Sequence, residues 1–577
     1  MSDSQSPAIP EEIPVPPAPL PSPGFLAWLA RRPLAVLAVL GLLLWLPGVL
    51  SLPPLDRDES RFAQSSRQMV ESGDPVDIRF GHVPRYKKPV GIYWLQAVST
   101  AALGGGDDSQ IWTYRVPSLL GAIIAARLTV WAAAAFLDAE AALIAGLLLL
   151  STVLLGAEAT IATTDAVLLA TIVAVQGVLL RLYRAAREGA PAPSTGQVLW
   201  GWAALGIGIL VKGPVSFGVA IATIIGLGIW DRNLRWLKDV RPLRGIALAA
   251  LLVVPWLVAI SIQSHGAFLQ QSVGNDFAAK LAGGQESHGS WPGYYLLLAA
   301  GAFFPAILFV LPGIAVGVAR RKEAAVRFLL VWAGAWWAGV EAVPTKLPHY
   351  VLPAYPALAI LATLFVTAAA PAVKHLALAI AVTRWIAGLQ YLVGGVLLVV
   401  AIAVAPHMLG GGNIYWLWGV AAAGACLMTA ALVMGLFTQR WSWSVILSLL
   451  AMLVLAPALT AGAGPRLSQL WISQQLKPLV EANTQPGDPP PAIAGYQEPS
   501  LVFALGADVN LTDGAGAAQA GAKSGGLALV EDAERGPFLA RLAELQGDPQ
   551  VVGEVSGLNY SRGRKVHILL YRTARVH

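Results

Sequence analysis

Long apolar runs separated by short polar connections cover most of the chain between residues 34 and 462. Runs of this length suit the hydrocarbon core of a bilayer, because a helix pairs its backbone groups internally. Counting them predicts about 13 membrane-spanning helices, at approximately residues 34–51, 115–136, 139–156, 163–182, 197–211, 214–230, 245–263, 293–317, 328–343, 350–369, 385–405, 414–436 and 443–462. The pattern therefore predicts an all-α polytopic membrane protein.

The two ends of the chain follow other patterns. Residues 1–30 begin with a proline-rich stretch without apolar periodicity, which predicts a disordered tail. Residues 31–462 form the predicted membrane domain, with a long outer loop at 52–114. Residues 463–577 combine a helical pattern in RGPFLARLAELQ with short strand candidates such as LVFALG, LALVED and KVHILLYRT. This last section is expected to be a small α/β domain outside the membrane.

Composition and charge support the prediction of a membrane protein and indicate how the chain is oriented in the membrane. Of the 577 residues, 56% are hydrophobic and only 12% are charged, whereas soluble domains carry about 25% charged residues. The net charge of +6 comes from short basic clusters at 181, 231, 319 and 438, all on one side of the predicted membrane. The positive-inside rule makes that side cytoplasmic, with the N-terminus, and places the loop 52–114 and the C-terminus on the opposite side, facing the periplasm or the cell exterior. Such clusters suit membrane lipids and argue against nucleic-acid binding.

The outer loop opens with DRDESRFAQSSRQMVESGD, residues 56–74. Phe62, Met69 and Val70 recur at helical spacing, which predicts an amphipathic helix along the membrane surface. Asp58 and Glu59 fall at its start, where carboxylates suit the helix dipole. Helix capping and a catalytic role are both compatible with this position.

Three further groups of polar residues lie at outer helix ends. Arg85, Tyr86, Lys87 and Lys88 precede an aromatic run, where cations pair with lipid headgroups or bind the phosphate of a lipid-linked substrate. Prolines break regular helix in KLPHYVLPAY, the segment that contains Lys346, His349 and Tyr350. Asp165 and Lys212 stand at two other helix ends. Each is a cavity candidate, with capping or an interfacial belt as the alternative.

Together these segments resemble the integral-membrane glycosyltransferases that use polyprenyl-phosphate sugars, the GT-C fold. The most similar branch comprises the aminoarabinose transferases of lipid A, related to the protein O-mannosyltransferases. The resemblance rests on DRDESRFAQSSRQMVESGD, YKKPVGIYWLQA, RVPSLL, TTDAVLL, VKGPV and KLPHYVLPAYPALAIL, in this order over about residues 30–370.

The resemblance implies roles for individual residues. It makes Asp58 the catalytic carboxylate, with Glu59 beside it and Arg61 one turn along. It assigns donor-phosphate binding to Lys88, helped by Arg85, Lys87 and Lys280, and places Tyr350 in the same cavity. We expect Asp58 to accept the proton of an acceptor hydroxyl while the cations stabilise the departing polyprenyl phosphate, in one inverting displacement.

The implied partners are a polyprenyl-phosphate-linked sugar donor and a lipid, glycan or protein acceptor. No metal site is predicted, because the histidines are scattered, although a divalent metal stays open. Relatives read Glu-Lys-Pro where this chain has Lys87, Lys88 and Pro89, which weakens the case for a shared metal site and an amino-sugar donor and would suit an anionic sugar such as a uronic acid.

A lipid or sugar transporter, a non-catalytic envelope scaffold and an oligosaccharyltransferase or polymerase are the alternatives. The transporter predicts inverted repeats and polar residues at helix midpoints, and the charges gather at helix ends instead.

Overall fold

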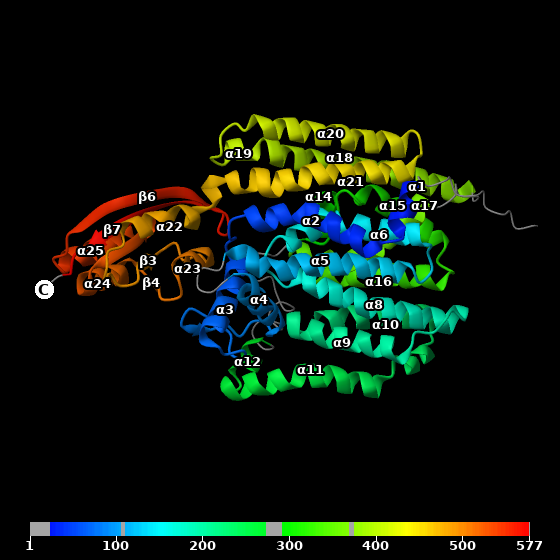
Figure 1. Cartoon of the computed structure of the whole chain (residues 1–577), viewed down its shortest axis with the longest axis horizontal. Helices are drawn as coiled ribbons and strands as arrows, with labels where there is room; N and C mark the ends of the chain where they lie inside the picture. Colours follow the sequence, from blue (N-terminus) through cyan, green and yellow to red (C-terminus); the bar gives the residue numbers. More distant parts are fainter. Residues whose placement is uncertain (1–23, 105–109, 273–290, 368–373, 576–577) are drawn as a thin grey trace, which may run out of the picture.

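The computed structural model describes residues 24–104, 110–272, 291–367 and 374–575. It consists of a large helical bundle with a smaller α/β unit at one end (Figure 1). The predicted N-terminal tail up to residue 23 and the candidate phosphate ligand Lys280 lie outside the described residues.

The bundle follows the apolar runs of the sequence. Its helices are α1 (Gly24–Ala30), α2 (Pro33–Ser51), α5 (Ile111–Ala133), α6 (Ala139–Leu150), α7 (Val153–Ala159), α8 (Asp165–Glu188), α9 (Thr195–Lys212), α10 (Val215–Asp231), η1 (Arg235–Val240), α11 (Pro242–Gln263), α14 (Tyr294–Ala302), α15 (Ile307–Ala319), α16 (Ala324–Ala342), η3 (Pro348–Ala354), α17 (Tyr355–Thr367), α18 (Lys374–Ala403), α19 (Ala405–Met408), α20 (Tyr415–Leu436), α21 (Trp441–Pro457), η4 (Ala458–Ala463), η5 (Gly464–Arg466) and η6 (Ser468–Leu470). The chain is therefore a multi-pass membrane protein.

Each segment predicted to span the membrane is helical, but the helices differ in length and hydropathy. Within the described ranges eight are long and apolar enough to cross a membrane, and the pair α6 and α7, bent by 66°, makes up to nine. The predicted segments at 197–211, 214–230, 293–317 and 328–343 fold into shorter or less apolar helices.

The first outer segment folds against one end of the bundle. It contains α3 (Asp58–Ser72), the short hairpin of β1 (Arg79–Phe80) and β2 (Val83–Pro84), and α4 (Gly91–Leu103), with α12 (Ala267–Leu269) nearby (Figure 1). Two carboxylates lie in the first turn of α3, and Gly73 ends it in the left-handed region, donating its N–H to the Met69 carbonyl. Phe62 and Met69 are buried as the apolar pattern predicted, whereas Val70 is exposed.

The C-terminal unit is a five-stranded sheet in the order β4-β3-β5-β7-β6. Strands β3, β4 and β5 are parallel, and β7 pairs antiparallel with both β5 and β6. Its elements are α22 (Ile472–Asn483), β3 (Ala492–Ala494), α23 (Pro499–Leu505), β4 (Asn510–Thr512), α24 (Gly514–Ser524), β5 (Gly526–Glu531), α25 (Asp532–Glu544), β6 (Pro549–Asn559) and β7 (Arg564–Thr573).

One predicted strand is wrong. The run LVFALG lies in helix α23, which begins at Pro499 and ends before Gly506. A short apolar run buried on several sides has no periodicity that separates strand from helix, and Pro499 at the first helical position is pre-organised for a helix.

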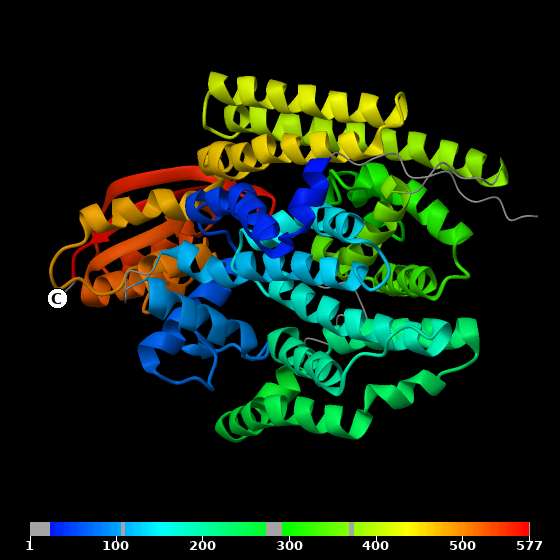
Figure 2. The same cartoon turned by 45° about the vertical axis from the view of Figure 1, so that its right-hand side comes forward.

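The two ends of the bundle differ in what they carry. The C-terminal unit, α3 and α4 lie at one end (Figures 1 and 2), and α1 lies toward the other (Figure 1). The basic connections that follow α8, α10, α15 and α20 lie at the end with α1. The structure therefore groups the basic loops on one side, as the charge pattern predicted.

Candidate active site

A cavity of about 270 Å³ lies between the first outer segment and the bundle. Its walls come from α3, the β2–α4 connection, α7, the ends of α8 and α9 that face each other, and η3. Most of the site residues predicted from the sequence line it, namely Asp58, Glu59, Arg61, Arg85, Lys87, Lys88, Asp165, Lys212, His349 and Tyr350. Segments up to about 300 residues apart in the sequence thus meet at one charged cavity.

Four carboxylates of this cavity form ion pairs among the described residues, namely Asp58, Glu59, Glu158 and Asp165. Asp58 is the most accessible of them, with 65% of its side chain exposed. Arg85 Nη2 and Arg61 Nη1 lie 3.7 and 3.8 Å from its Oδ1. Desolvation inside the cavity raises the pKa of Asp58. The charges of Arg85, Arg61, His349 and Lys88 lower it by more, so the pKa lies below its usual value. Asp58 is therefore ionised and open to a ligand.

Glu59 has a different environment, although it is the next residue. Its side chain is buried and pairs with Arg115, with Nε to Oε1 at 2.7 Å and Nη2 to Oε2 at 2.9 Å. The backbone N–H groups of Ala162 and Leu55 also donate to it, both at 2.8 Å. Both carboxylate oxygens are thus occupied, which suits a positioning role better than the catalytic role expected from the sequence.

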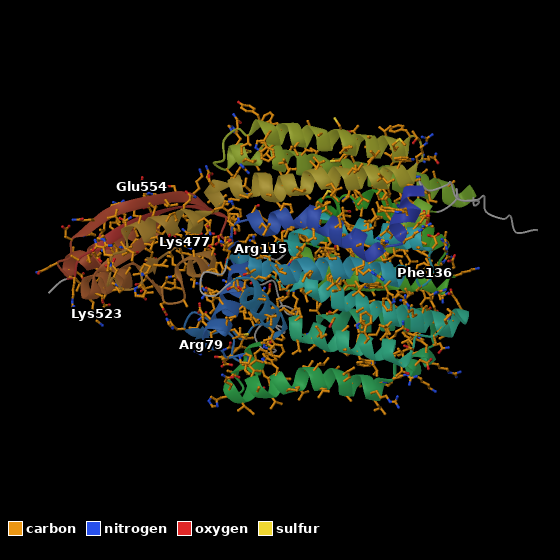
Figure 3. The ribbon with its side chains drawn as sticks, in the orientation of Figure 1. Arg79, Arg115, Phe136, Lys477, Lys523 and Glu554 are labelled. Atoms are coloured by element: carbon orange, nitrogen blue, oxygen red, sulfur yellow. The ribbon has the colours of Figure 1, made fainter. Side chains whose placement is uncertain are left out.

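Arg115 joins this arrangement to the bundle. It lies at the end of the bundle that faces the C-terminal unit (Figure 3), and its guanidinium also donates to the carbonyls of Val49, Leu52 and Pro53. One fully buried side chain therefore ties the end of α2, the loop before α3 and the start of α5 together. Charge-assisted bonds of this kind are among the strongest in proteins.

The wall opposite Asp58 carries two more carboxylates. Asp165, the first residue of α8, accepts from Lys212 Nζ at 2.6 and 2.8 Å. Glu158 in α7 accepts from the Thr163 hydroxyl at 2.8 Å and lies 3.7 Å from His349 Nδ1. Glu158 reaches the cavity because the span breaks between α6 and α7, where the hydroxyls of Ser151 and Thr152 bond back to the carbonyls of Leu148 and Leu149.

Two predicted cavity residues lie elsewhere. Tyr86 is buried and its hydroxyl donates to Asp77 at 3.0 Å. Lys346 is buried too, and its ammonium donates to the carbonyls of Val340, Glu341 and Val343 at the end of α16. Neither lines the cavity, because in each case a nearby acceptor turns the polar head back toward its own segment.

Sequence reasoning missed several residues of the site. Arg115 and Glu158 are ionisable residues inside apolar segments, where such residues are functional candidates by default. That signal was available and could have identified both. Asp56 and Arg57 line the cavity as well, yet nothing in their local sequence separates them from Asp58. In the described part of the chain no group of three or more His, Cys, Asp or Glu side chains is placed to hold a metal ion.

The chain is similar in sequence to known proteins. Residues 87–258 match the family model described as dolichyl-phosphate-mannose-protein mannosyltransferase. The chain is 28% identical over 328 residues to the undecaprenyl phosphate-alpha-4-amino-4-deoxy-L-arabinose arabinosyl transferase of Pectobacterium carotovorum subsp. carotovorum, covering 55% of this chain and 56% of that protein. It is 29% identical over 323 residues to the enzyme of the same name from Aeromonas salmonicida, covering 54% and 56%. The chain thus spans little more than half the length of these relatives.

Solved structures extend the likeness to the whole fold. ArnT from Cupriavidus metallidurans, in a crystal structure bound to undecaprenyl phosphate, superposes with a TM-score of 0.70 at 18% identity, covering 95% of this chain and 98% of ArnT. The oligosaccharyltransferase of Archaeoglobus fulgidus gives a TM-score of 0.52 at 12% identity, covering 84% and 65%. The GT-C fold and the resemblance inferred from the sequence are confirmed.

Proposed function

We propose that this protein is a membrane glycosyltransferase that moves a sugar from a polyprenyl-phosphate donor to a lipid, glycan or protein acceptor. The observation that supports this most directly is the cavity, in which an ionised, accessible carboxylate faces a set of cations. Glycosyl transfer from a phosphate needs both, a base for the acceptor and positive charge for the leaving group. Relatives that match the chain carry names of this activity.

The cations would hold the donor phosphate. Arg85, Lys87 and Lys88 enter the cavity from one connection, between β2 and α4. Arg85 is further oriented by Phe62, whose ring centroid lies 4.9 Å from the guanidinium carbon. As the bond between the anomeric carbon and the phosphate oxygen breaks, its electron pair stays on the polyprenyl phosphate, and these cations stabilise the added negative charge.

Asp58 would act on the acceptor. The acceptor oxygen forms a bond to the anomeric carbon from the face opposite the leaving phosphate, so the configuration inverts, and its proton passes to Asp58. The lowered pKa keeps Asp58 in the carboxylate form that this step needs. If the acceptor is itself a phosphate, it brings no proton at neutral pH, and Asp58 would stabilise positive charge on the anomeric carbon.

Two assignments accompany this function. The membrane domain would span residues 31–462 and the outer α/β domain residues 463–577, on the periplasmic side with the cavity, while the N-terminus stays cytoplasmic. The grouping of the basic connections at the end remote from the cavity supports this orientation.

The experiment compares total lipids and envelope glycans by mass spectrometry in cells that lack the gene. The deletion strain is complemented with wild type, Asp58→Asn or Lys88→Ala. A polyprenyl-phosphate sugar that accumulates, with one glycan or lipid losing the same mass, and restoration by wild type alone would support the transferase. Unchanged profiles would refute it and favour the transporter or scaffold alternatives.

A further inference from the structure

The loop that precedes Asp58 contacts the C-terminal unit. The backbone N–H of Asp56 donates to the Tyr560 hydroxyl at 2.6 Å, across 504 residues of sequence. The Arg57 guanidinium donates to the Ser561 carbonyl, and the Ser500 hydroxyl donates to the Asp56 carboxylate. Two consecutive residues of the cavity wall are therefore held by a unit whose described residues do not line the cavity.

Arg57 has an unusual backbone conformation. Its φ is +65° and its ψ is −116°, in a region that residues with a Cβ rarely adopt. Such conformations persist only where the surroundings hold them, and they cluster at functional sites. Because Asp58 follows directly, the torsions of Arg57 set the direction in which the Asp58 side chain leaves the backbone.

The loop is held from both sides. On the bundle side Glu59 is bound by Arg115. On the other side Tyr560 and Ser561 belong to the turn between β6 and β7. That turn is itself fixed, since Asn559 Nδ2 donates to the buried Glu498 carboxylate at 2.8 Å and the Ser561 hydroxyl donates to Asn559 Oδ1 at 2.9 Å.

We propose that the β6–β7 turn of the C-terminal unit is a positioning element for the reaction, with Tyr560 as its main residue. Tyr560 fixes the backbone at Asp56 and thereby the conformation of Arg57 that directs Asp58 into the cavity. This inference rests on the proposed transferase function. It gives the C-terminal unit a part in the chemical step that is separate from donor binding, because the cations lie on the β2–α4 connection.

Tyr560→Phe tests this directly. The variant keeps the aromatic ring and its edge contact with Trp471, at 6.3 Å between centroids, and loses only the hydroxyl that accepts from Asp56. The matched control is Tyr571→Phe in β7, a buried tyrosine of the same unit whose hydroxyl has no hydrogen-bond partner among the described residues. Ser500→Ala is a second variant, which removes the donor to the Asp56 side chain.

The expected result separates positioning from stability and binding. With the polyprenyl-linked sugar isolated from the deletion strain as donor, we expect Tyr560→Phe to lower kcat about tenfold at unchanged KM, since misdirecting the base affects the transition state alone. Binding of undecaprenyl phosphate to the purified protein and the Tm should stay as in wild type. Hydrogen exchange of residues 53–62 should become faster in Tyr560→Phe and stay unchanged in Tyr571→Phe.

Each outcome decides the inference. If Tyr560→Phe and Ser500→Ala both keep wild-type kcat, or if Tyr571→Phe lowers kcat equally, the positioning role is refuted while the transferase function stands. If Tyr560→Phe also lowers the Tm, Ser500→Ala is used in its place. A lowered kcat of Ser500→Ala at wild-type Tm then supports the positioning role, and a wild-type kcat refutes it. If wild type transfers no sugar in any preparation, the proposed function fails, and the inference fails with it.

Discussion

Both ends of the bundle hold an aspartate with two arginines, and the two clusters differ in how far they are closed. The side chain of Asp231, the last residue of α10, is 5% exposed and is bound by Arg327 at 2.6 Å and Arg187 at 2.9 Å. The Tyr183 hydroxyl adds a bond of 2.5 Å. Asp58 meets its two arginines at 3.7 and 3.8 Å and stays 65% exposed.

The difference shows how the same residue types serve two purposes. Around Asp231 the cations come from α8 and α16, and one binds each carboxylate oxygen. The cluster therefore connects three helices, and both oxygens are already bound. Around Asp58 the distances exceed hydrogen-bond length, so the cations lower the pKa of the carboxylate without occupying it. A saturated cluster suits stability, and an incompletely paired one suits chemistry.

The largest expected effect is that of Asp58→Asn, which removes the base and leaves its size unchanged. We expect sugar transfer to fall about 10³-fold, within the range measured for a lost general base, while the Tm stays within about 2 °C of wild type, as for most exposed sites. The rate is measured with the isolated donor and the Tm by thermal unfolding in detergent. Full complementation by Asp58→Asn would show that this carboxylate is not the base.

Asp231→Asn should have the opposite effect. Removing the charge takes the carboxylate from Arg187 and Arg327, whose side chains are partly exposed and keep other acceptors, and loss of a hydrogen bond to a charged group costs about 1.5–3 kcal/mol of stability. The rate per folded molecule should stay as in wild type, because the cavity lies at the other end. Denaturant or thermal unfolding measures the loss of stability, and turnover normalised to folded protein measures the rate. A stable but inactive variant would contradict the comparison.

Lys88→Met should weaken donor binding. A hydrogen bond to a charged group contributes about 1.5–3 kcal/mol, so the Kd for undecaprenyl phosphate is expected to rise about 10- to 100-fold, and less in high salt. The matched control is Lys477→Met in α22, a half-exposed lysine of the C-terminal unit that lies 3.7 Å from Glu481 (Figure 3). Equal loss in both variants would mean that general charge, and not the cavity, binds the phosphate.

The smallest expected effect concerns pH. Burial is the main cause that raises the pKa of Asp56 to about 7, and the charge of Glu498 adds to it. The hydrogen bond from Ser500 and the charge of Arg57 act in the opposite direction. Tyr496 also acts to lower this pKa, and the Tyr560 hydroxyl accepts from the Asp56 backbone N–H. The folded state therefore keeps a proton that the unfolded chain loses above its usual pKa.

The sign of the pH effect follows from that proton. The contribution of Asp56 to stability is complete below pH about 4, declines as the pH rises, and is lost once the pH passes about 7. We expect the Tm to fall by a few degrees between pH 5 and pH 7.5, and Asp56→Asn to reduce this fall. An equal fall in both proteins would assign the dependence to other groups.

Much of the molecule could be predicted from local patterns. The apolar runs indicated the helices, because a span is defined by length and hydropathy within one segment. The positions of Asp58, Lys88 and Tyr350 in their motifs indicated that they share a site, and they line one cavity. The strand LVFALG was wrong because a short apolar run carries no period.

What the sequence by itself determined is the set of helices, the side on which charge gathers and the residue types available for chemistry. Only the tertiary structure decided which of two adjacent carboxylates is free. Asp58 and Glu59 look alike in the sequence, but Arg115, 56 residues away from Glu59, fills both oxygens of Glu59 and leaves Asp58 to the cavity. The physical reason is that pairing depends on distances in space, and the contacts at Glu59, Lys346 and Tyr560 exist only once the helices and the C-terminal unit have packed.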